Sequence, residues 1–398
     1  MAKIITFGCK VNQYESQLIK ENIEKDENFK SNDIVILNSC CVTEKAEKEV
    51  EKKIRELLNQ RKKIYLTGCI AEKNGKFKEI GNIKIVEKSF FFKYKDKIEY
   101  FNRHTRAFVK IEDGCENFCT YCIIPFIRGR VKSRSEKEII EEIKQLVENG
   151  YKEIVLTGVN LGCYGKDTGE SLISLIEKIQ EIEEIKRIRL SSIEVYYINE
   201  PFINSLKNIK KFCPHFHMPL QSGSDKILSL MGRRYSFNEY YEKIEKIKEK
   251  IEKVTFTTDI MVGFPGEKDD DFEKSCIAID KIKFLKVHIF PYSERKITSA
   301  VSLPDKVDEK TKKERLKKIL KISEISRKKV MEEFIGKRLD VLFEKKIDHF
   351  WKGYSENYIP VIVNSERNLK NEIVSVIPQK IYKGFLLSKI LNQKRSKV

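Results

Sequence analysis

Short apolar runs alternate with longer charged stretches along the first hundred residues. Three runs have the length of buried strands, at residues 3–7, 33–37 and 64–67. The stretches between them, 12–25 and 43–61, have the length and mixed polarity of surface helices. Continuous apolar strands that alternate with helices indicate a parallel sheet covered on both faces. We therefore predict a small parallel-sheet α/β domain over residues 1–100.

The same alternation continues to about residue 305, with longer loops. Six apolar runs are predicted strands: 106–112, 153–157, 187–191, 215–218, 254–262 and 285–290. Helical stretches follow the strands, among them 136–149, 172–181, 199–207 and 270–281. Six strand–helix units are fewer than the eight of a complete barrel, so the pattern predicts a partial (β/α)6 barrel. Its chemistry should lie at the carboxyl ends of the strands, where polar and glycine-rich segments cluster.

The pattern changes again near the C-terminus. Residues 308–334 form a lysine-rich amphipathic stretch, and about five short strands follow it, at 339–343, 351–354, 359–363, 373–377 and 384–390. So many short strands in sixty residues predict a small all-β barrel of the OB-like type, whose aromatic and basic residues often bind RNA. Trp351, Tyr354 and Tyr358 suit that use, although they could equally form the core of a structural cap. We expect domains at 1–100, 101–335 and 336–398.

Composition narrows the class of protein. The 398 residues carry a net charge of +18, which favours a polyanionic partner such as nucleic acid. Lysine is spread along the whole chain, so solvated helices could account for part of that charge. No apolar run approaches the roughly 20 residues that span a bilayer, and the first residues lack the features of a signal peptide. Ten cysteines without an export signal indicate metal or redox chemistry in a reducing, cytoplasmic setting.

One short segment combines three of these cysteines. Cys115, Cys119 and Cys122 have the spacing C-x3-C-x2-C, and three thiolates on one loop can hold three corners of a [4Fe–4S] cube. No fourth cysteine is near, so one iron would stay open. With Tyr121 before the last cysteine, the segment resembles the radical S-adenosylmethionine (SAM) superfamily, in which the open iron binds SAM. The alternative is a zinc site with a distant fourth ligand, although paired zinc spacings are absent.

A second set of cysteines follows the three N-terminal strands. Cys9, Cys40 and Cys69 each come just after a predicted strand. Because the carboxyl ends of parallel strands share one edge of a sheet, these thiols should converge and could hold a second [4Fe–4S] cluster. The alternative is that they are buried structural cysteines. Cys41 should point away from Cys40, so we take it as a bystander. The remaining three, Cys163, Cys213 and Cys276, have no partner spacing and are expected to be buried bystanders.

Other polar and glycine residues lie where SAM would bind. The candidates at the predicted strand ends are Tyr121, Gly158, Asn160, Ser192, Glu194, Gln221, Ser222, Asp259 and Gly263. Each of them could instead be an ordinary turn or cap residue. After the cysteine loop, Arg128, Arg130 and Arg134 form a basic segment that suits phosphate or carboxylate, unless it is only a solvated loop.

Several motifs together resemble the methylthiotransferase family. They are Gly8-Cys9-Lys10-Val11-Asn12-Gln13-Tyr14-Glu15-Ser16, Asn38-Ser39-Cys40, Gly68-Cys69-Ile70-Ala71, the cysteine loop, Leu156-Thr157-Gly158-Val159-Asn160-Leu161-Gly162 and His217-Met218-Pro219-Leu220-Gln221-Ser222-Gly223-Ser224. The resemblance is strongest to the branch that acts on threonylcarbamoyladenosine in tRNA. It implies an N-terminal cluster domain, a radical SAM core and a C-terminal TRAM domain. Cys41 departs from the family, which usually has alanine there.

The resemblance also implies roles for these residues. The SAM-binding cluster would be held by Cys115, Cys119 and Cys122, and the second [4Fe–4S] cluster by the other three thiols. The substrate would be threonylcarbamoyladenosine 3′ of the anticodon, converted into its 2-methylthio form, and Arg128, Arg130 or Arg134 could pair with its carboxylate. A flavodoxin- or ferredoxin-type electron donor is expected, and the sulfur donor is left open. Alternatives are methylthiotransferases acting on isopentenyladenosine in tRNA or on an aspartate of a ribosomal protein, and a non-enzymatic iron–sulfur protein that binds RNA.

Overall fold

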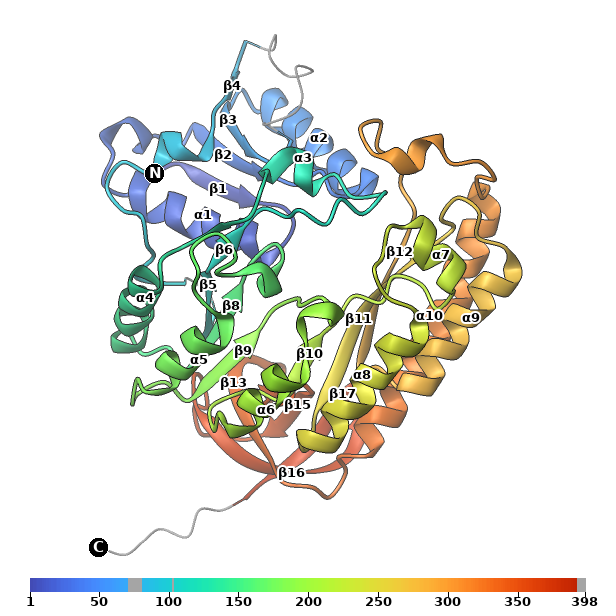
Figure 1. The fold of residues 1–398 in the computed structure, drawn as a ribbon. Helices are drawn as coiled ribbons and strands as arrows, with labels where there is room; N and C mark the ends of the chain where they lie inside the picture. Colours follow the sequence, from blue (N-terminus) through green and yellow to red (C-terminus); the bar gives the residue numbers. More distant parts are fainter. Residues whose placement is uncertain (71–80, 102–103, 392–398) are drawn as a thin grey trace, which may run out of the picture. The chain divides into compact units, whose positions relative to one another are not determined.

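The structure is a computed structural model of the chain that describes residues 1–70, 81–101 and 104–391 (Figure 1). The chain forms two compact units, each described below by itself. The first comprises Met1–Gly150, Ile154–Lys178 and Ser293–Val301. The second comprises Tyr151–Glu153, Ile179–Tyr292 and Ser302–Val398.

The first unit begins with the predicted parallel sheet. Its strands lie in the order β1 (Lys3–Thr6), β2 (Ile34–Ser39), β3 (Lys63–Gly68) and β4 (Ile83–Ile85), and every pair is parallel. Side chains of α1 (Lys10–Ile23) pack in an apolar core on one face, and those of α2 (Glu44–Asn59) in a core on the other. The expected small α/β domain is confirmed, with β4 as a strand that the sequence pattern did not predict.

The rest of the first unit carries the cysteine loop. The predicted strand at 106–112 is split into β5 (Arg106–Lys110) and β6 (Glu112–Asp113). The antiparallel partner of β6 is β7 (Lys132–Ser133), so the segment between them is closed at its base by a two-residue ladder. Elements of this part also include α3 (Ile124–Arg128), α4 (Glu136–Glu148), β8 (Glu153–Thr157) and α5 (Leu172–Gln180), of which β8 and α5 extend slightly past the unit's bounds.

The second unit contains the later strand–helix repeats. Three parallel strands form one sheet, β10 (His215–His217), β11 (Thr255–Val262) and β12 (Lys286–Pro291). β9 (Arg187–Leu190) is joined to the segment around β10 only by single bridges, Ile188 to Phe212 and Ser192 to His217. The helices are α6 (Glu200–Asn208), α7 (Asp225–Leu230), α8 (Phe237–Lys250), α9 (Asp269–Ile282) and α10 (Glu309–Glu332). All six predicted core strands are present, in short parallel sheets.

A closed barrel of five strands ends the second unit (Figure 1). The strands are β13 (Leu339–Ile347), β14 (Phe350–Ser355), β15 (Pro360–Asn364), β16 (Ile373–Tyr382) and β17 (Phe385–Ile390), in the order β13-β14-β15-β17-β16. Trp351 packs in the core of this barrel beside Val363 and Leu386. The indole is therefore not available as a surface aromatic, whereas Tyr354 and Tyr358 stack on one another at 5.0 Å.

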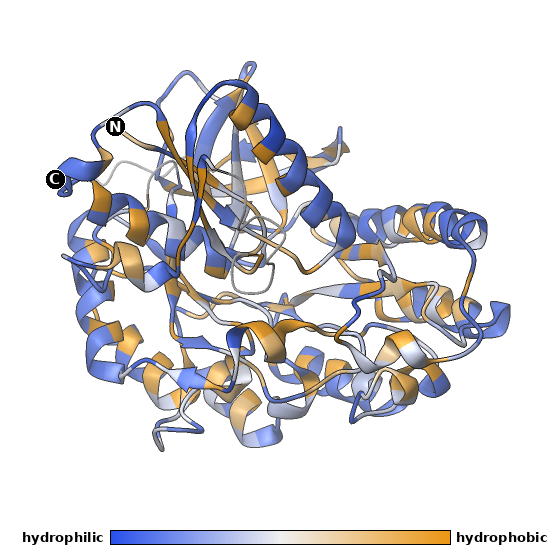
Figure 2. Ribbon diagram, turned by 90° about the horizontal axis from the view of Figure 1, so that it is seen from above, coloured by the Kyte–Doolittle hydropathy of each residue, from blue (hydrophilic) through white to orange (hydrophobic). Residues whose placement is uncertain are grey.

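Apolar residues in Figure 2 lie on the strands and alternate with hydrophilic residues along the helices. Within the described residues, no helix is both long enough and apolar enough to cross a membrane.

Buried ion pairs connect the barrel to the core of the second unit. The carboxylate of Glu153 accepts hydrogen bonds from Arg189 at 2.7 Å and Arg187 at 3.4 Å. Arg187 also donates to the carbonyl oxygen of Tyr354 at 3.2 Å, and Arg189 to that of Ser355 at 3.3 Å. One carboxylate thus holds two guanidinium groups that bind the barrel through its backbone.

Replacing Glu153 should therefore loosen the second unit. In Glu153→Gln, two buried guanidinium groups lose their counter-charge, and we expect a loss of about 3–5 kcal/mol in the free energy of unfolding. Urea denaturation of the metal-free chain measures this loss. The exposed Glu184→Gln variant is the matched control, and an equal stability of both variants would contradict this account.

Candidate active site

The loop between β6 and β7 presents three cysteines on a folded turn. The backbone N–H of Cys122 donates to the carbonyl oxygen of Cys119 at 2.9 Å, and that of Cys115 to Gly129 at 3.0 Å. All three thiols are partly exposed. Burial, together with the neighbouring Cys119, raises the pKa of Cys115 to about 11. Cys115 and Cys119 are thus close enough to interact.

An amide side chain is aimed at this loop from the segment after β8. Asn160 is buried, and its Nδ2 lies 3.6 Å from Sγ of Cys115 and 3.1 Å from Sγ of Cys163. Its Oδ1 has no hydrogen-bond partner among the described residues. Donors directed at sulfur stabilise metal-bound thiolates. Cys163, which the spacing left as a bystander, therefore lies next to the same amide as Cys115.

A buried carboxyl group supports Asn160. The backbone N–H of Asn160 donates to Glu112, and a side chain at Gly158 would overlap that carboxyl group. Burial raises the pKa of Glu112 to about 8, against the lowering effect of the Asn160 N–H. The sequence predicts a close approach of Gly158 to SAM. In the structure, the space that a Cβ of residue 158 would need is occupied by the carboxyl group of Glu112.

The second set of cysteines also comes together, at the carboxyl ends of β1, β2 and β3. At Gly8, where φ is +98°, an added Cβ would lie 2.9 Å from Sγ of Cys40, so only glycine lets the first loop approach so closely. Burial, together with the nearby Cys69 and Cys9, raises the pKa of Cys40 to about 11. Cys9 is exposed, whereas Cys40 and Cys69 are buried. This is the convergence that the strand ends predict.

Cys41 lies differently from its neighbour. Its Sγ donates to the carbonyl oxygen of Cys69 at 3.3 Å, and the residue belongs to the apolar core that includes Val50 and Ile54. Burial raises its pKa to about 12. Cys41 therefore lies within the apolar core, and the assignment of Cys40 as the ligand and Cys41 as a bystander stays a prediction.

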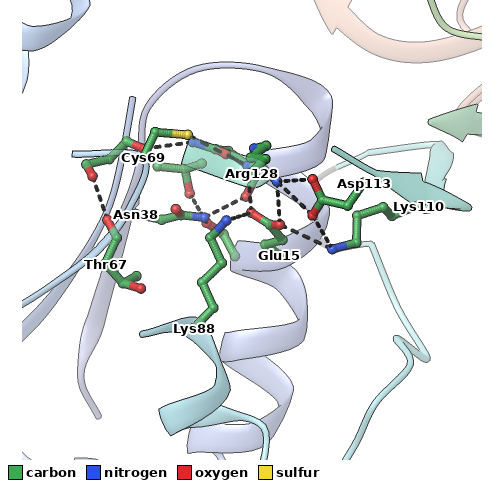
Figure 3. A network of polar contacts seen from close by, with 12 residues as sticks. Glu15, Asn38, Thr67, Cys69, Lys88, Lys110, Asp113 and Arg128 are labelled. Atoms are coloured by element: carbon green, nitrogen blue, oxygen red, sulfur yellow. Dashed lines mark hydrogen bonds and ion pairs between the residues drawn. The ribbon is translucent and has the colours of Figure 1, made fainter. Parts of the chain in front are cut away.

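The three arginines after the cysteine loop have different environments. Arg128 is buried, with 3% of its side chain exposed, and donates to Glu15 at 3.0 Å and to Asp113 at 2.9 Å (Figure 3). Arg134 donates to the buried Glu142 and, at 3.1 Å, to the hydroxyl oxygen of Tyr14. Arg130 is 92% exposed and lies 3.9 Å from Glu116. Two of the three proposed substrate contacts are thus engaged in buried pairs, and only Arg130 stays a candidate for an incoming anion.

Tyr121 lies on the cysteine loop of the first unit, and its role toward SAM stays a prediction, whereas the remaining SAM candidates lie in the second unit. Glu194 is held by Arg233, and Asp259 lies 3.2 Å from Nε2 of His217. Gln221 is buried with φ at 69°, and its Oε1 has no hydrogen-bond partner in the part of the chain that the structure describes. Arg233 was not among the residues predicted for this site, and His217 was named only as the first residue of a motif.

Three other SAM candidates of this unit have backbone or hydroxyl partners. Ser222 lies 3.3 Å from the hydroxyl of Ser275, and the backbone N–H of Gly263 donates to Glu267. The backbone of Ser192 forms an isolated parallel β-bridge with the backbone of His217. These contacts give each residue a structural partner and leave its role toward SAM a prediction.

The donor set of the first unit fits iron–sulfur clusters. Each set offers three thiols, and each has a nitrogen donor directed at one sulfur, Asn160 at Cys115 and Arg128 at Cys69. Among the described residues, no three His, Cys, Asp or Glu side chains gather as around a single metal ion. A cluster of several irons takes each thiolate at a separate iron, so its ligands can stand further apart.

The two neighbouring cysteines should behave differently. We expect Cys40→Ser to lose the iron of one cluster, about half of the total, because serine replaces a thiolate ligand. Cys41→Ser should keep its full iron content. Iron and sulfide analysis after anaerobic reconstitution measures both, and an equal loss in both variants would show that Cys41 can act as a ligand.

The buried Glu112 should make stability depend on pH. A carboxyl group whose pKa rises to about 8 on folding holds its proton more tightly in the native state. Stability from this group is complete below the unfolded pKa and falls as pH rises toward 8. We expect Glu112→Gln to remove this decline, which amounts to about 5 kcal/mol between pH 4 and pH 9, since one pKa unit is about 1.4 kcal/mol.

Denaturation of the metal-free protein at several pH values, with both chains compared at each pH, measures the difference. Parallel pH curves for the two chains would contradict the assignment.

Comparison with known proteins connects these sites to families. Residues 109–277 match the Radical SAM superfamily, and residues 1–89 match the Uncharacterized protein family UPF0004. These matches contain the two cysteine sets respectively. In a search of solved structures, the fold is similar to TsrM, a radical S-adenosylmethionine methyltransferase from Kitasatospora setae. The TM-score is 0.50 at 12% identity, covering 73% of this chain and 74% of that one.

Relatives with higher identity span almost the whole chain. A protein of Thermotoga maritima named threonylcarbamoyladenosine tRNA methylthiotransferase MtaB is 38% identical, with 90% of each chain covered. The MtaB protein of Bacillus subtilis is 33% identical, over 93% of this chain and 92% of its own length. A tRNA-2-methylthio-N(6)-dimethylallyladenosine synthase of Acetivibrio thermocellus is 32% identical, over 93% of this chain and 87% of its own. This chain belongs to the methylthiotransferase family of radical SAM enzymes.

Proposed function

We propose that this protein converts N6-threonylcarbamoyladenosine, 3′ of the anticodon in tRNA, into its 2-methylthio derivative. One observation carries the proposal: both three-cysteine sets lie in the same compact unit of a chain whose 38% identical relative has that name. A methylthio transfer needs two functions, activation of the substrate carbon and delivery of sulfur, and each set of cysteines would serve one of them.

The residues that would hold the cofactors follow from the geometry. Cys115, Cys119 and Cys122 would hold the cluster that binds SAM, and Cys9, Cys40 and Cys69 would hold the second. When bound, the first cluster and SAM supply a carbon-centred radical, and the second cluster supplies a binding place for the sulfur to be transferred. Asn160 orients Cys115, and the exposed position of Cys9 leaves the second set accessible to a substrate.

The cysteine loop offers a surface for the nucleoside. Phe118 and Phe126 are exposed and lie edge to face at 6.0 Å. With Ile297 and Cys119 they line a cavity of about 240 Å³. Aromatic side chains that line such a cavity can stack on unpaired bases. The exposed guanidinium of Arg130 on the same loop suits the threonyl carboxylate or a phosphate.

The C-terminal barrel is proposed to bind the tRNA. Its order β13-β14-β15-β17-β16, with β15 parallel to β17, supports an OB-like barrel of the TRAM type. Lys352 lies over the rings of Tyr354 and Phe385, which combines positive charge with aromatic surface. We keep the division into domains at 1–100, 101–335 and 336–398. We also keep a cytoplasmic location beside the tRNA pool, and a flavodoxin- or ferredoxin-type reductant.

A second candidate substrate is supported by one relative. The Acetivibrio thermocellus protein is named for dimethylallyladenosine, at 32% identity. The sites in the first unit would serve either nucleoside, since the modification at C2 is the same. A carboxylate is present only on the threonylcarbamoyl substrate, so an exposed cation on the cysteine loop favours that one.

The experiment is an anaerobic assay of the reconstituted chain with SAM, a reductant and tRNA that carries threonylcarbamoyladenosine. We expect a digested nucleoside heavier by one methylthio group. If it is absent while 5′-deoxyadenosine accumulates, the substrate assignment is wrong, and tRNA with isopentenyladenosine is tested next. If neither product forms in reconstituted protein, the enzymatic proposal fails.

In the same assay, Arg130→Gln should reduce methylthio transfer about tenfold or more, because a charge-assisted contact to the substrate is lost. Cleavage of SAM without tRNA should be unchanged. Lys132→Gln, at an exposed cation on β7 just after the loop, is the matched control. Equal losses of transfer and of SAM cleavage in Arg130→Gln would argue against a substrate contact.

A further inference from the structure

Arg128 contacts both cysteine sites of the first unit through their flanking residues (Figure 3). It ends α3, six residues after Cys122, and its Nη1 donates to Asp113, two residues before Cys115. Its Nη2 lies 3.8 Å from Sγ of Cys69, a proposed ligand of the other cluster. A single guanidinium group therefore contacts a thiol of one set and a residue that flanks the other set.

The same group holds the N-terminal loops in place through Asn12. Nη2 of Arg128 donates to Oδ1 of Asn12 at 2.7 Å. The Nδ2 of Asn12 donates in turn to the carbonyl oxygens of Phe7 at 2.8 Å and Ser39 at 2.9 Å. These carbonyl groups lie two residues before Cys9 and one before Cys40. With its own contact to Cys69, Arg128 is thus connected to all three N-terminal cysteine loops.

Other charged groups fix Arg128 in place. Glu15 accepts from Arg128, from Lys110 at 3.2 Å and from Lys88 at 2.8 Å, and Lys110 also pairs with Asp113 at 3.1 Å. Although burial raises the pKa of Glu15, these three cations hold it well below its usual range. Arg128 is thus fixed by a network of ion pairs beside Sγ of Cys69.

A buried guanidinium group is stable only when its charge and its N–H groups find partners. The sulfur of Cys69 is the acceptor that completes the contacts of Arg128 in Figure 3. A cluster bound through thiolates brings negative charge to that position. The network is therefore arranged for an anionic cluster at the N-terminal cysteines, and Arg128 is the member that touches it.

We propose that Arg128 is the positioning residue of the N-terminal cluster, and that its guanidinium raises the reduction potential of that cluster through Sγ of Cys69. This inference depends on the proposed function, in which Cys9, Cys40 and Cys69 hold a cluster. Reduction adds an electron, and a cation with an N–H directed at a ligand sulfur stabilises the reduced form. The role replaces the substrate contact that the sequence suggested for Arg128.

The test uses the full chain with Cys115, Cys119 and Cys122 replaced by serine, so that only the N-terminal cluster is present. In this background, Arg128, Arg128→Lys and Arg128→Gln are compared by iron content and by a potentiometric titration followed by electron paramagnetic resonance. We expect the midpoint potential to become more negative in the order Arg, Lys, Gln. Lysine keeps the charge but lacks the planar fork that reaches Asn12 and the sulfur together.

Arg134→Lys in the same background is the matched control, because Arg134 is also paired with a buried carboxylate but has Glu142 and Tyr14 as partners. It should lower stability and leave the potential unchanged. If Arg128→Lys and Arg128→Gln both bind a cluster whose potential is unchanged, the inference is overturned and the proposed function is not affected. If Arg128→Gln does not fold, the Lys variant decides.

A background protein that retains Arg128, is folded and binds no iron would overturn the cluster assignment and this inference with it. Iron content therefore distinguishes the two outcomes: absence of iron contradicts the proposed function, whereas bound iron with an unchanged potential contradicts only the role of Arg128.

Discussion

The first unit depends on one buried guanidinium group. Burial of an arginine side chain is unfavourable unless its charge and its N–H groups find partners. Arg128 has these partners on α1, on β6 and at the end of β3, three segments that are far apart in the sequence. The carboxylates fix the guanidinium, and the guanidinium in turn fixes the loops that carry cysteines. Thiolates that repel one another can gather there because positive charge is already in place.

The second unit uses the same physical device for a different purpose. Glu153 holds Arg187 and Arg189, whose remaining N–H groups bind backbone carbonyls of the C-terminal barrel. In both units a planar fork of donors meets a carboxylate on one side and another part of the chain on the other. The first arrangement supports a reactive site, and the second attaches a candidate RNA-binding barrel to the core.

The sequence predicted most elements because their signals are local. Apolar runs identified the strands of the parallel sheets except β4, and the strand ends predicted that Cys9, Cys40 and Cys69 come together. The ladder of β6 and β7 was missed because two residues per strand leave no periodicity. The roles of Arg128 and Arg134 were missed because every charged residue of their segment is basic, so none of them stands out. Their partners Glu15 and Tyr14 also lie more than a hundred residues away in the sequence. The signal that could have found them is a helix, α1, whose polar residues Glu15, Gln17 and Asn22 are buried.

The short ladder that closes the cysteine loop affects how the enzyme can be assembled. Pairing of Glu112 and Asp113 with Lys132 and Ser133 brings the ends of the loop together when the chain folds. The entropy of closing the loop is therefore lost during folding and not when iron arrives. A carrier protein can deliver a cluster to a loop that already has its shape. After damage by oxygen, the emptied loop would keep that shape, so repair requires new iron and sulfide but no refolding.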